Sequence, residues 1–268
     1  MRFGITANPE HKHALDATRA ILRLLKGKHE VLLEDAVAKA LKLRGASLEG
    51  IRADIVLAIG GDGTVLRALQ RSRERVVGVN TGSVGFLAEG DYDSLDILVD
   101  RLLRGDYHVE ERLKLKVMVD GKRQYDCVNE VVVHTSQVAK IRHYEIRVDG
   151  AVAEQIRADG IIVATPTGST SYSMSAGGPI LDPRVRAFVV AAIAPFKPSF
   201  HPFVVPHDSR IQVTFLRPRP GLLVLDGQVE IPLKGEEKVV MTESEKRARL
   251  VRFGDIFYRR IHEKLANP

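Results

Sequence analysis

The sequence predicts an N-terminal α/β domain with an open, mainly parallel sheet, followed by a β-rich, sandwich-like domain. Its 268 residues are enough for one large or two modest domains. Through the first hundred residues, short apolar runs alternate with helical patterns, which is typical of a parallel sheet covered by helices. Beyond residue 104, many short strand patterns follow one another between turn residues, which indicates a β-rich second part.

The first domain is predicted to span residues 1–103. Its clearest strand is 54–59, a continuous apolar run of the kind that parallel sheets bury on both faces. The pattern predicts strands at 2–6, 31–33 and 75–79 and helices at 11–26, 36–43, 64–71 and 94–103.

The second domain is predicted to span residues 104–253. Two Asp-Gly pairs, at 120–121 and 149–150, are typical of tight hairpin turns. The predicted strands are 113–119, 125–133, 144–148, 161–164, 187–193, 210–215 and 222–225. The remaining residues, 254–268, predict an amphipathic C-terminal helix that is free to pack back on the N-terminal domain.

Composition limits the classes of partner. The 40 Lys and Arg exceed the 34 Asp and Glu by six, a mild excess that suits an anionic small molecule. No basic stripe interleaved with aromatic residues is present, so we expect no nucleic-acid partner. A single cysteine, Cys127, excludes an intrachain disulfide and indicates a reducing compartment. Without a secretory signal or an apolar span, we expect a cytoplasmic protein with no membrane partner.

The motif Gly60-Gly61-Asp62-Gly63-Thr64 lies between the clearest strand and a helix. This place corresponds to the carboxyl edge of an α/β sheet, where ligands usually bind. Glycines there let backbone N–H groups approach phosphate oxygens, and the helix N-terminus favours an anion. The aspartate would repel a phosphate, so it suits a base for a hydroxyl or a magnesium ligand better. A plain strand-to-helix turn with Asp62 near the N-cap is the alternative.

Two further segments resemble ligand-binding loops. The first, residues 80–87, follows a predicted strand and combines glycines with small polar residues. The second, residues 159–179, leads from a strand into a turn rich in hydroxyl groups, with Tyr172 as its one aromatic ring. Such a combination suits the recognition of a sugar and a flat base. A tight turn stabilised by its own Ser and Thr hydroxyls is the alternative.

Together with Asn129-Glu130 and Asp226-Gly227-Gln228, these segments resemble the NAD kinase family. The matches keep the family's order and cover residues 54–228. The GGDGT motif alone is shared with lipid kinases and phosphofructokinases, whereas the hydroxyl-rich segment with Asn-Glu upstream is more specific. The resemblance implies an active site between an α/β domain and a sandwich-like domain.

The resemblance also implies the reaction. The γ-phosphoryl group of ATP, or a phosphoryl group of polyphosphate, would pass to the 2′-hydroxyl of the adenosine ribose of NAD and give NADP. A divalent metal cation, Mg²⁺ before others, would assist, although no metal ligands can be assigned. Family members are commonly homodimers or homotetramers, so the resemblance implies a homo-oligomer.

The family's roles can be transferred to matching residues. Asp62 resembles the family's general base, and Asn129 and Glu130 resemble the pair that binds the adenosine part of NAD. Their alternative role is a polar start to the apolar strand 131–133. The expected phosphate loop is Gly60, Gly61, Gly63 and Thr64. The expected NAD-binding residues are Asp62, Gly63, Arg67, Asn129, Glu130, Lys140, Arg157, Asp159, Thr170, Ser171, Tyr172, Ser173, Met174, Ser175 and Gln228.

Two other functions stay open at this point. A lipid kinase of the GGDGT superfamily would need an apolar acceptor pocket, which the hydroxyl-rich segment disfavours. A non-catalytic dinucleotide sensor would not need Asp62 between two glycines. The sequence departs from the family's pattern at Ser171, at Ser83-Val84 and over residues 194–200. These departures leave open the choice of ATP or polyphosphate and of NAD or NADH.

Overall fold

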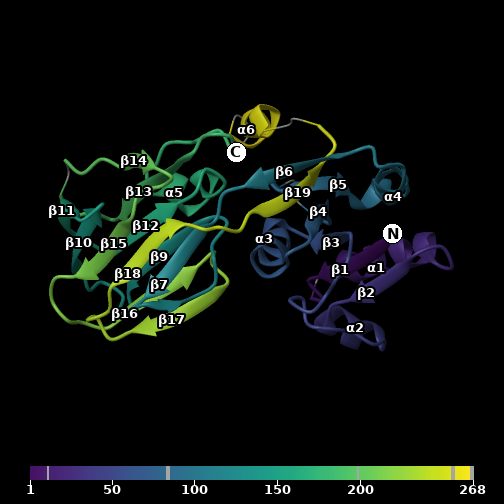
Figure 1. Cartoon of the computed structure of the whole chain (residues 1–268), viewed down its shortest axis with the longest axis horizontal. Coiled ribbons are helices and arrows are strands. Elements are labelled where there is room, and N and C mark those ends of the chain that lie inside the picture. Colours follow the sequence, from purple (N-terminus) through teal and green to yellow (C-terminus); the bar gives the residue numbers. More distant parts are fainter. Residues whose placement is uncertain (11, 83–84, 198, 255–256, 266–268) are drawn as a thin grey trace. The chain divides into compact units, whose positions relative to one another are not determined.

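The computed structural model describes residues 1–10, 12–82, 85–197, 199–254 and 257–265 (Figure 1). The chain forms two compact units. The first comprises Met1–Glu111 together with Ala248–Pro268, and the second comprises Arg112–Arg247.

The first unit is a mostly parallel sheet covered by helices. Its strands are β1 (Arg2–Ala7), β2 (Glu30–Leu33), β3 (Ile55–Gly60), β4 (Arg75–Asn80), β5 (Ala88–Asp91), β6 (His108–Arg112) and β19 (Ala248–Arg252). Its helices are α1 (Lys12–Leu25), α2 (Asp35–Leu41), α3 (Asp62–Arg71), α4 (Leu95–Arg104) and α6 (Phe257–Leu265), with a short 3-10 turn, η1 (Tyr92–Ser94). The sheet order is β2-β1-β3-β4-β19-β6, and β5 pairs with β4.

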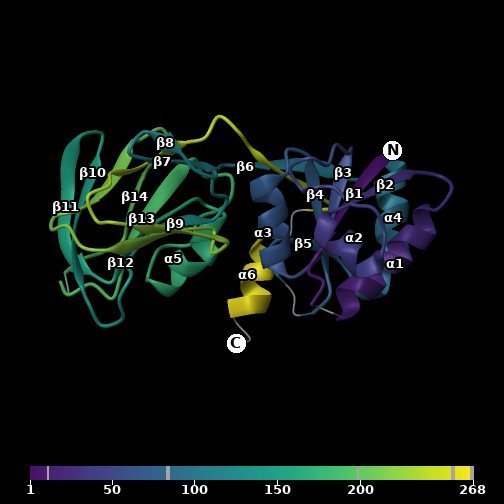
Figure 2. The ribbon, with the colours of Figure 1, turned by 90° about the horizontal axis from the view of Figure 1, so that it is seen from below.

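Strand β3 lies in the middle of this sheet because it is apolar on both faces. All six of its residues are buried, and it pairs in parallel with both β1 and β4. The apolar faces of α1 and α4 pack over Ile55, Leu57 and Ile59. Helix α3 packs against β3 and β4 from the opposite side, where Val65 approaches the backbone of Gly78 (Figure 2).

The second unit contains two antiparallel sheets of six strands each. Their orders are β11-β10-β15-β18-β7-β8 and β14-β13-β12-β9-β16-β17. The strands of the first sheet are β7 (Leu115–Val119), β8 (Lys122–Arg123), β10 (Arg142–Val148), β11 (Ala151–Ala158), β15 (Ile211–Phe215) and β18 (Val239–Glu243). Those of the second are β9 (Glu130–Thr135), β12 (Gly160–Ala164), β13 (Ala187–Ile193), β14 (Phe203–Pro206), β16 (Gly221–Leu225) and β17 (Val229–Leu233).

Alternating apolar residues of both sheets form one shared core in the second unit, including Val131 and Val133 of β9 with Tyr144 and Ile146 of β10. The other face of β9, β12 and β13 carries a smaller cluster. Ala176 and Leu181, from the segment beyond η2 (Gly168–Thr170) and α5 (Tyr172–Ser175), pack against that cluster. The hydroxyl-rich segment is therefore fixed to the outside of the sandwich.

The structure confirms the predicted fold class, an α/β part with a mainly parallel sheet and a β-rich, sandwich-like part. The predicted boundaries at 103/104 and 253/254 differ from the observed units, because residues 104–111 and 248–253 belong to the first unit. Strand β19 pairs in parallel with β4, so the chain returns to the first sheet after the second unit is complete. A local pattern cannot reveal such a return, since it reports strands but not their partners.

Several elements differ from the sequence prediction in their bounds. Helix α3 begins at Asp62 instead of residue 64, and the strand expected at 125–133 begins only at Glu130. Strand β5 was not predicted, because residues 88–91 have little apolar character. Residues 11, 83 and 84, which belong to expected elements, lie outside the described residues. Among the residues that are described, no helix is long and apolar enough to cross a membrane.

Replacing Leu57 by alanine tests the role of β3. The side chain is fully buried, so L57A is expected to lower the free energy of unfolding by about 2–5 kcal/mol through lost burial and a residual cavity. The matched control is L24A, which removes the same atoms from a side chain that is 39% exposed. Urea unfolding measures both, and equal losses in the two variants would contradict the central position of β3.

Candidate active site

Asp62 is the first residue of α3 and is separated from the carboxyl end of β3 by Gly61 alone. Gly61 has an extended backbone at the N-cap, and its carbonyl accepts the first helical hydrogen bonds, from the N–H groups of Thr64 (2.9 Å) and Val65 (3.3 Å). The motif thus forms a sharp strand-to-helix turn in which the backbone of residues 61–63 is exposed or half-buried. A turn of this kind presents N–H groups and the positive end of a helix to an anion.

The carboxylate of Asp62 is fixed by the loop that follows β4. Oδ2 accepts the N–H of Phe86 at 2.6 Å, and Oδ1 accepts the N–H of Leu87 at 3.0 Å. Each oxygen keeps a further lone pair, and the side chain is half-buried. The carboxylate is therefore oriented by backbone while it retains the capacity to accept a hydroxyl proton.

Arg67, one turn further along α3, is already paired. Its two terminal nitrogens contact the two carboxylate oxygens of Glu34 at 2.7 Å each, and one of them also donates to the hydroxyl of Thr6 at 2.8 Å. Bidentate pairs of this kind are strong and directional. Arg67 thus ties α3 to β1 and to the start of α2, and its expected contact with phosphate stays a prediction.

In the second unit, Glu130 begins β9 with a buried carboxyl group. Oε1 accepts a hydrogen bond of 3.4 Å from the Ser171 hydroxyl, while Oε2 finds no partner among the described residues. The buried Oδ1 of Asn129 and the hydroxyl of Ser173 likewise find none there. Buried polar atoms are normally hydrogen-bonded, so the unpartnered oxygens of the adjacent residues Asn129 and Glu130 mark a candidate ligand site.

Both acidic residues of this site, Glu130 and Asp226, have raised pKa values. Burial and, after it, the negative charge of Asp226 raise the pKa of Glu130 to about 8, against the opposing hydrogen bond from Ser171. Burial also raises the pKa of Asp226, to about 6, against three backbone hydrogen bonds and the charge of Lys114. At neutral pH the Glu130 carboxyl can therefore donate one hydrogen bond and accept others.

Asp226 is the site residue that the sequence did not assign. Its carboxylate accepts the N–H groups of Val128 (2.8 Å), Asn129 (2.7 Å) and Glu130 (3.1 Å). Three such bonds fix the chain just where it enters β9, and so they orient the Asn129 and Glu130 side chains. The Asp226-Gly227-Gln228 motif was the available signal, but only Gln228, which is exposed, had been expected to bind.

The hydroxyl-rich segment divides into two parts. Thr165, Ser169 and Thr170 donate to backbone carbonyls of Val128, Pro166 and Thr167 at 2.5, 2.7 and 3.3 Å. These hydroxyls therefore stabilise the turn, as the alternative interpretation expected. A Cβ on Gly168 would lie only 2.2 Å from the Asn129 carbonyl oxygen, so the turn packs directly on the Asn129 backbone. Beyond it, α5 supplies Tyr172, Ser173, Met174 and Ser175.

Strand register separates the expected NAD-binding residues of the second unit. In the antiparallel pair β9 and β12, Glu130 lies opposite Ala164, whereas His134 lies opposite Gly160. Four residue steps along a strand span about 13 Å. Asn129, Glu130, Ser171 and Asp226 share the first end.

Three other expected residues lie at the opposite end: Lys140 between β9 and β10, Arg157 within β11, and Asp159 between β11 and β12. The Asp159 carbonyl accepts the Thr135 N–H at 2.8 Å, and the Arg157 guanidinium lies 4.7 Å above the Phe196 ring centre. Lys140 is exposed in the connection between β9 and β10. The structure therefore does not bring these three residues together with Asn129 and Glu130.

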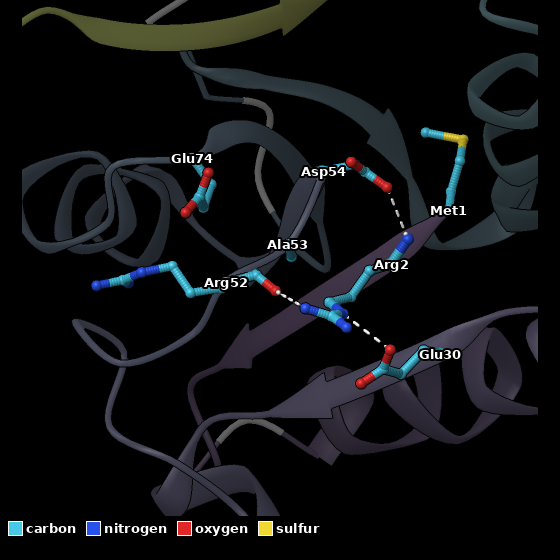
Figure 3. Close-up of a pocket in the computed structure, with 7 residues that line it drawn as sticks. All are labelled: Met1, Arg2, Glu30, Arg52, Ala53, Asp54 and Glu74. Atoms are coloured by element: carbon cyan, nitrogen blue, oxygen red, sulfur yellow. Dashed lines mark hydrogen bonds and ion pairs between the residues drawn. The ribbon is translucent and has the colours of Figure 1, made fainter.

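A surface pocket in the first unit lies at the opposite edge of its sheet (Figure 3). Arg2 crosses it, with its backbone N–H on Asp54 and its guanidinium on Glu30, both at 2.8 Å. These residues precede or begin β1, β2 and β3, so the pocket opens at the amino ends of the parallel strands. Ligands of such sheets bind at the carboxyl ends, where Asp62 lies, so this pocket is not the candidate site.

The donor groups near Asp62 do not form a protein metal centre. Across the described ranges, no cluster of three or more His, Cys, Asp or Glu side chains could hold an ion. Mg²⁺ often needs only one or two carboxylates when phosphates and water complete its shell. The expected divalent cation therefore stays a prediction.

Comparison with known proteins identifies the family. The models of the ATP-NAD kinase N-terminal and C-terminal domains match residues 3–107 and 128–253. The NAD kinase of Thermoplasma volcanium is 41% identical over 266 residues, covering 99% of this chain and 98% of the relative. The chain belongs to the NAD kinase family. It is therefore a phosphotransferase.

Other relatives agree over the whole length. The NAD kinase of Methanothermobacter thermautotrophicus is 42% identical over 273 residues, covering 99% of this chain and 96% of the relative. A crystal structure of an NAD kinase from Archaeoglobus fulgidus in complex with ATP is 30% identical, with a TM-score of 0.82 and 99% coverage of each chain. Yeast NADH kinase complexed with NADH has the same fold, with a TM-score of 0.90 at 23% identity, covering 100% of this chain and 88% of the yeast chain.

The raised pKa of Glu130 predicts a pH-dependent stability. Because the folded state binds this proton more tightly than the unfolded state, the contribution is complete below pH 4.5 and is lost as the pH rises through 8. Between pH 6 and 8, the free energy of unfolding should fall by about 2 kcal/mol more in the unchanged protein than in E130Q.

Urea unfolding at the two pH values measures this difference. The matched control is E230Q, which changes an exposed glutamate in β17 and should keep the full pH dependence. Parallel pH profiles for E130Q and the unchanged protein would contradict the proton on Glu130.

Proposed function

We propose that this protein transfers the γ-phosphoryl group of ATP to the 2′-hydroxyl of the adenosine ribose of NAD, giving NADP and ADP. The observation that carries the proposal is Asp62, at the carboxyl end of β3 and oriented by two backbone N–H groups, in a chain that matches NAD kinases over its full length.

In this proposal Asp62 is the general base. As the 2′-oxygen bonds to the γ-phosphorus, the bond from that phosphorus to its bridging oxygen breaks, and the hydroxyl proton passes to the Asp62 carboxylate. The hydrogen bonds from Phe86 and Leu87 leave lone pairs on the carboxylate for that proton. Phosphoryl transfer depends mainly on positioning and electrostatics, so the fixed orientation of the base is the protein's main contribution at this atom.

The turn before α3 is the proposed phosphate loop. The N–H groups of Gly61 and Gly63 lie in or before the first turn of a ten-residue helix, where they have no carbonyl four residues earlier within the helix, whereas the N–H of Thr64 donates to the Gly61 carbonyl. The same turn faces the end of the sheet at which nucleotides bind. A divalent cation would arrive with the nucleotide and be bound chiefly through its phosphates. It would neutralise phosphate charge.

Asn129 and Glu130 are the proposed contacts for the adenosine part of NAD. The buried, unpartnered oxygens of both side chains, together with a protonated Glu130, offer acceptors and a donor to ribose and base. Tyr172 is 41% exposed on α5, close in sequence to the Ser171 hydroxyl that reaches Glu130, and suits stacking on a base. Contacts from Lys140, Arg157, Asp159 and Gln228, polyphosphate as a second donor, and a homodimer or homotetramer remain proposals.

The aspartate is tested by D62N. With NAD, ATP and Mg²⁺, the variant is expected to lose about 10²–10⁴-fold in kcat, because the amide cannot take the hydroxyl proton, while NAD still binds. The matched control is D96N, which alters an exposed acidic residue in the first turn of α4. Liquid chromatography of NADP measures the rate, and calorimetry measures NAD binding.

The same assay separates the alternatives. Full activity of D62N would contradict the general base. An unchanged protein that binds NAD but forms no NADP with ATP or polyphosphate would be a dinucleotide sensor. Repeating the assay with NADH determines the preferred acceptor, and light scattering determines the number of subunits.

A further inference from the structure

The loop that holds Asp62 is itself held from its other side. Residues 86 and 87 turn their N–H groups toward the Asp62 carboxylate. Their carbonyl groups point to arginines from the C-terminal part of the chain, more than 160 residues later in sequence. Because residues 86 and 87 contact both groups, the position of the C-terminal arginines affects the position of the Asp62 carboxylate.

Arg260 of α6 makes most of these contacts. One terminal nitrogen donates to the carbonyl of Phe86 at 2.6 Å, and the other donates to the carbonyl of Ala88. A single planar guanidinium thus bridges two carbonyls on either side of Leu87. Lys264, one turn later, places its ammonium 4.6 Å from the centre of the Phe86 ring.

Arg252, the last residue of β19, holds the carbonyl between them. Its guanidinium donates to the carbonyl of Leu87 at 3.2 Å, forms a buried ion pair with Glu89 at 2.5 Å, and forms a second ion pair with the half-buried Glu110 at 3.0 Å. Glu89 also accepts the N–H of Phe253 and lies 3.7 Å from Arg260. The three carbonyls of residues 86–88 are therefore bound by two buried arginines.

Burying the charged guanidinium of Arg260 costs free energy, and a helix that only covered a surface would not require it. Its side chain is 9% exposed. Burial and, after it, the neighbouring charge of Arg252 lower the pKa of its guanidinium to about 10, against the opposing charges of Glu89 and Asp62. A buried cation that is retained in this way needs paired acceptors, and here most of them are loop carbonyls.

Gly85 shows how closely the loop approaches the aspartate. A Cβ at this position would lie 1.8 Å from Oδ1 of Asp62, far inside any contact distance. Only glycine lets the chain pass the carboxylate here and then present its next two N–H groups.

We propose that Arg260 is a positioning residue for phosphoryl transfer, which holds the carbonyls of Phe86 and Ala88 so that the intervening backbone fixes the Asp62 carboxylate. The proposal rests on the proposed role of Asp62 as the base. Arg260 contacts no reacting atom in this scheme, and it acts on Asp62 through the loop that it holds and through the attraction between their charges.

The first test compares R260A and R260K with R259A. Arg259 is the neighbouring residue of α6 and is 69% exposed, with only a 3.7 Å contact to Glu263, so R259A controls for the loss of charge from the helix. R260A is expected to lower kcat by about 10²-fold, because a displacement near 1 Å of a catalytic group costs about that much. The KM for NAD should stay within about twofold, R260K should recover part of the rate, and R259A should match the unchanged protein.

The decisive test places R260A in the D62N background. If Arg260 acts through Asp62, the double variant should be no slower than D62N alone, since residues acting as one unit are not additive. Multiplied losses in the double variant, or a folded R260A with unchanged kcat, would overturn the proposal. Full activity of D62N would instead contradict the proposed base, so the two failures are distinguishable.

G85A keeps the test decisive if R260A does not fold. This variant leaves α6 unchanged and displaces the loop from Asp62, so it should also lower kcat about 10²-fold. In the D62N background it should cause no further loss of kcat. Circular dichroism establishes that each variant is folded. Normal kcat in a folded G85A would overturn the proposal.

Discussion

Several elements of the first unit meet around one carboxylate, that of Asp62, and fix its position. Strand β3, buried on both faces, ends at Gly60, and α3 begins at Asp62 because Gly61 makes the turn between them. The loop after β4 then donates two N–H groups to the carboxylate. Two buried arginines from β19 and α6, which belong to the part of the chain that returns to the first unit, bind the carbonyls of that loop.

The second unit repeats this principle with a different carboxylate. Asp226 accepts three successive backbone N–H groups and so fixes the start of β9. The Glu130 carboxyl that follows is buried with one oxygen unpartnered among the described residues. In both units, therefore, an acid with a proposed function is positioned by backbone hydrogen bonds, which are less variable than contacts between two flexible side chains.

Sequence reasoning predicted what depends on local pattern. The fold class followed from apolar periodicity, and the motif around Asp62 followed from the spacing of glycines after a strand. Pairings distant in sequence were not predictable, so the roles of Asp226, Arg252 and Arg260 were missed, and Arg67 was expected at phosphate although Glu34 pairs with it. The separation of Asp159 from Glu130 required the register of β9 and β12, which no single strand reveals.

The central claim is that Asp62 takes the proton of the 2′-hydroxyl, and a crystal structure with bound NAD tests it most directly. If Asp62 takes this proton, one of its carboxylate oxygens lies within about 2.6–3.2 Å of the 2′-oxygen of the adenosine ribose, or is joined to it through one water. A 2′-hydroxyl that instead contacts another side chain, with Asp62 beyond the reach of one water, would contradict it.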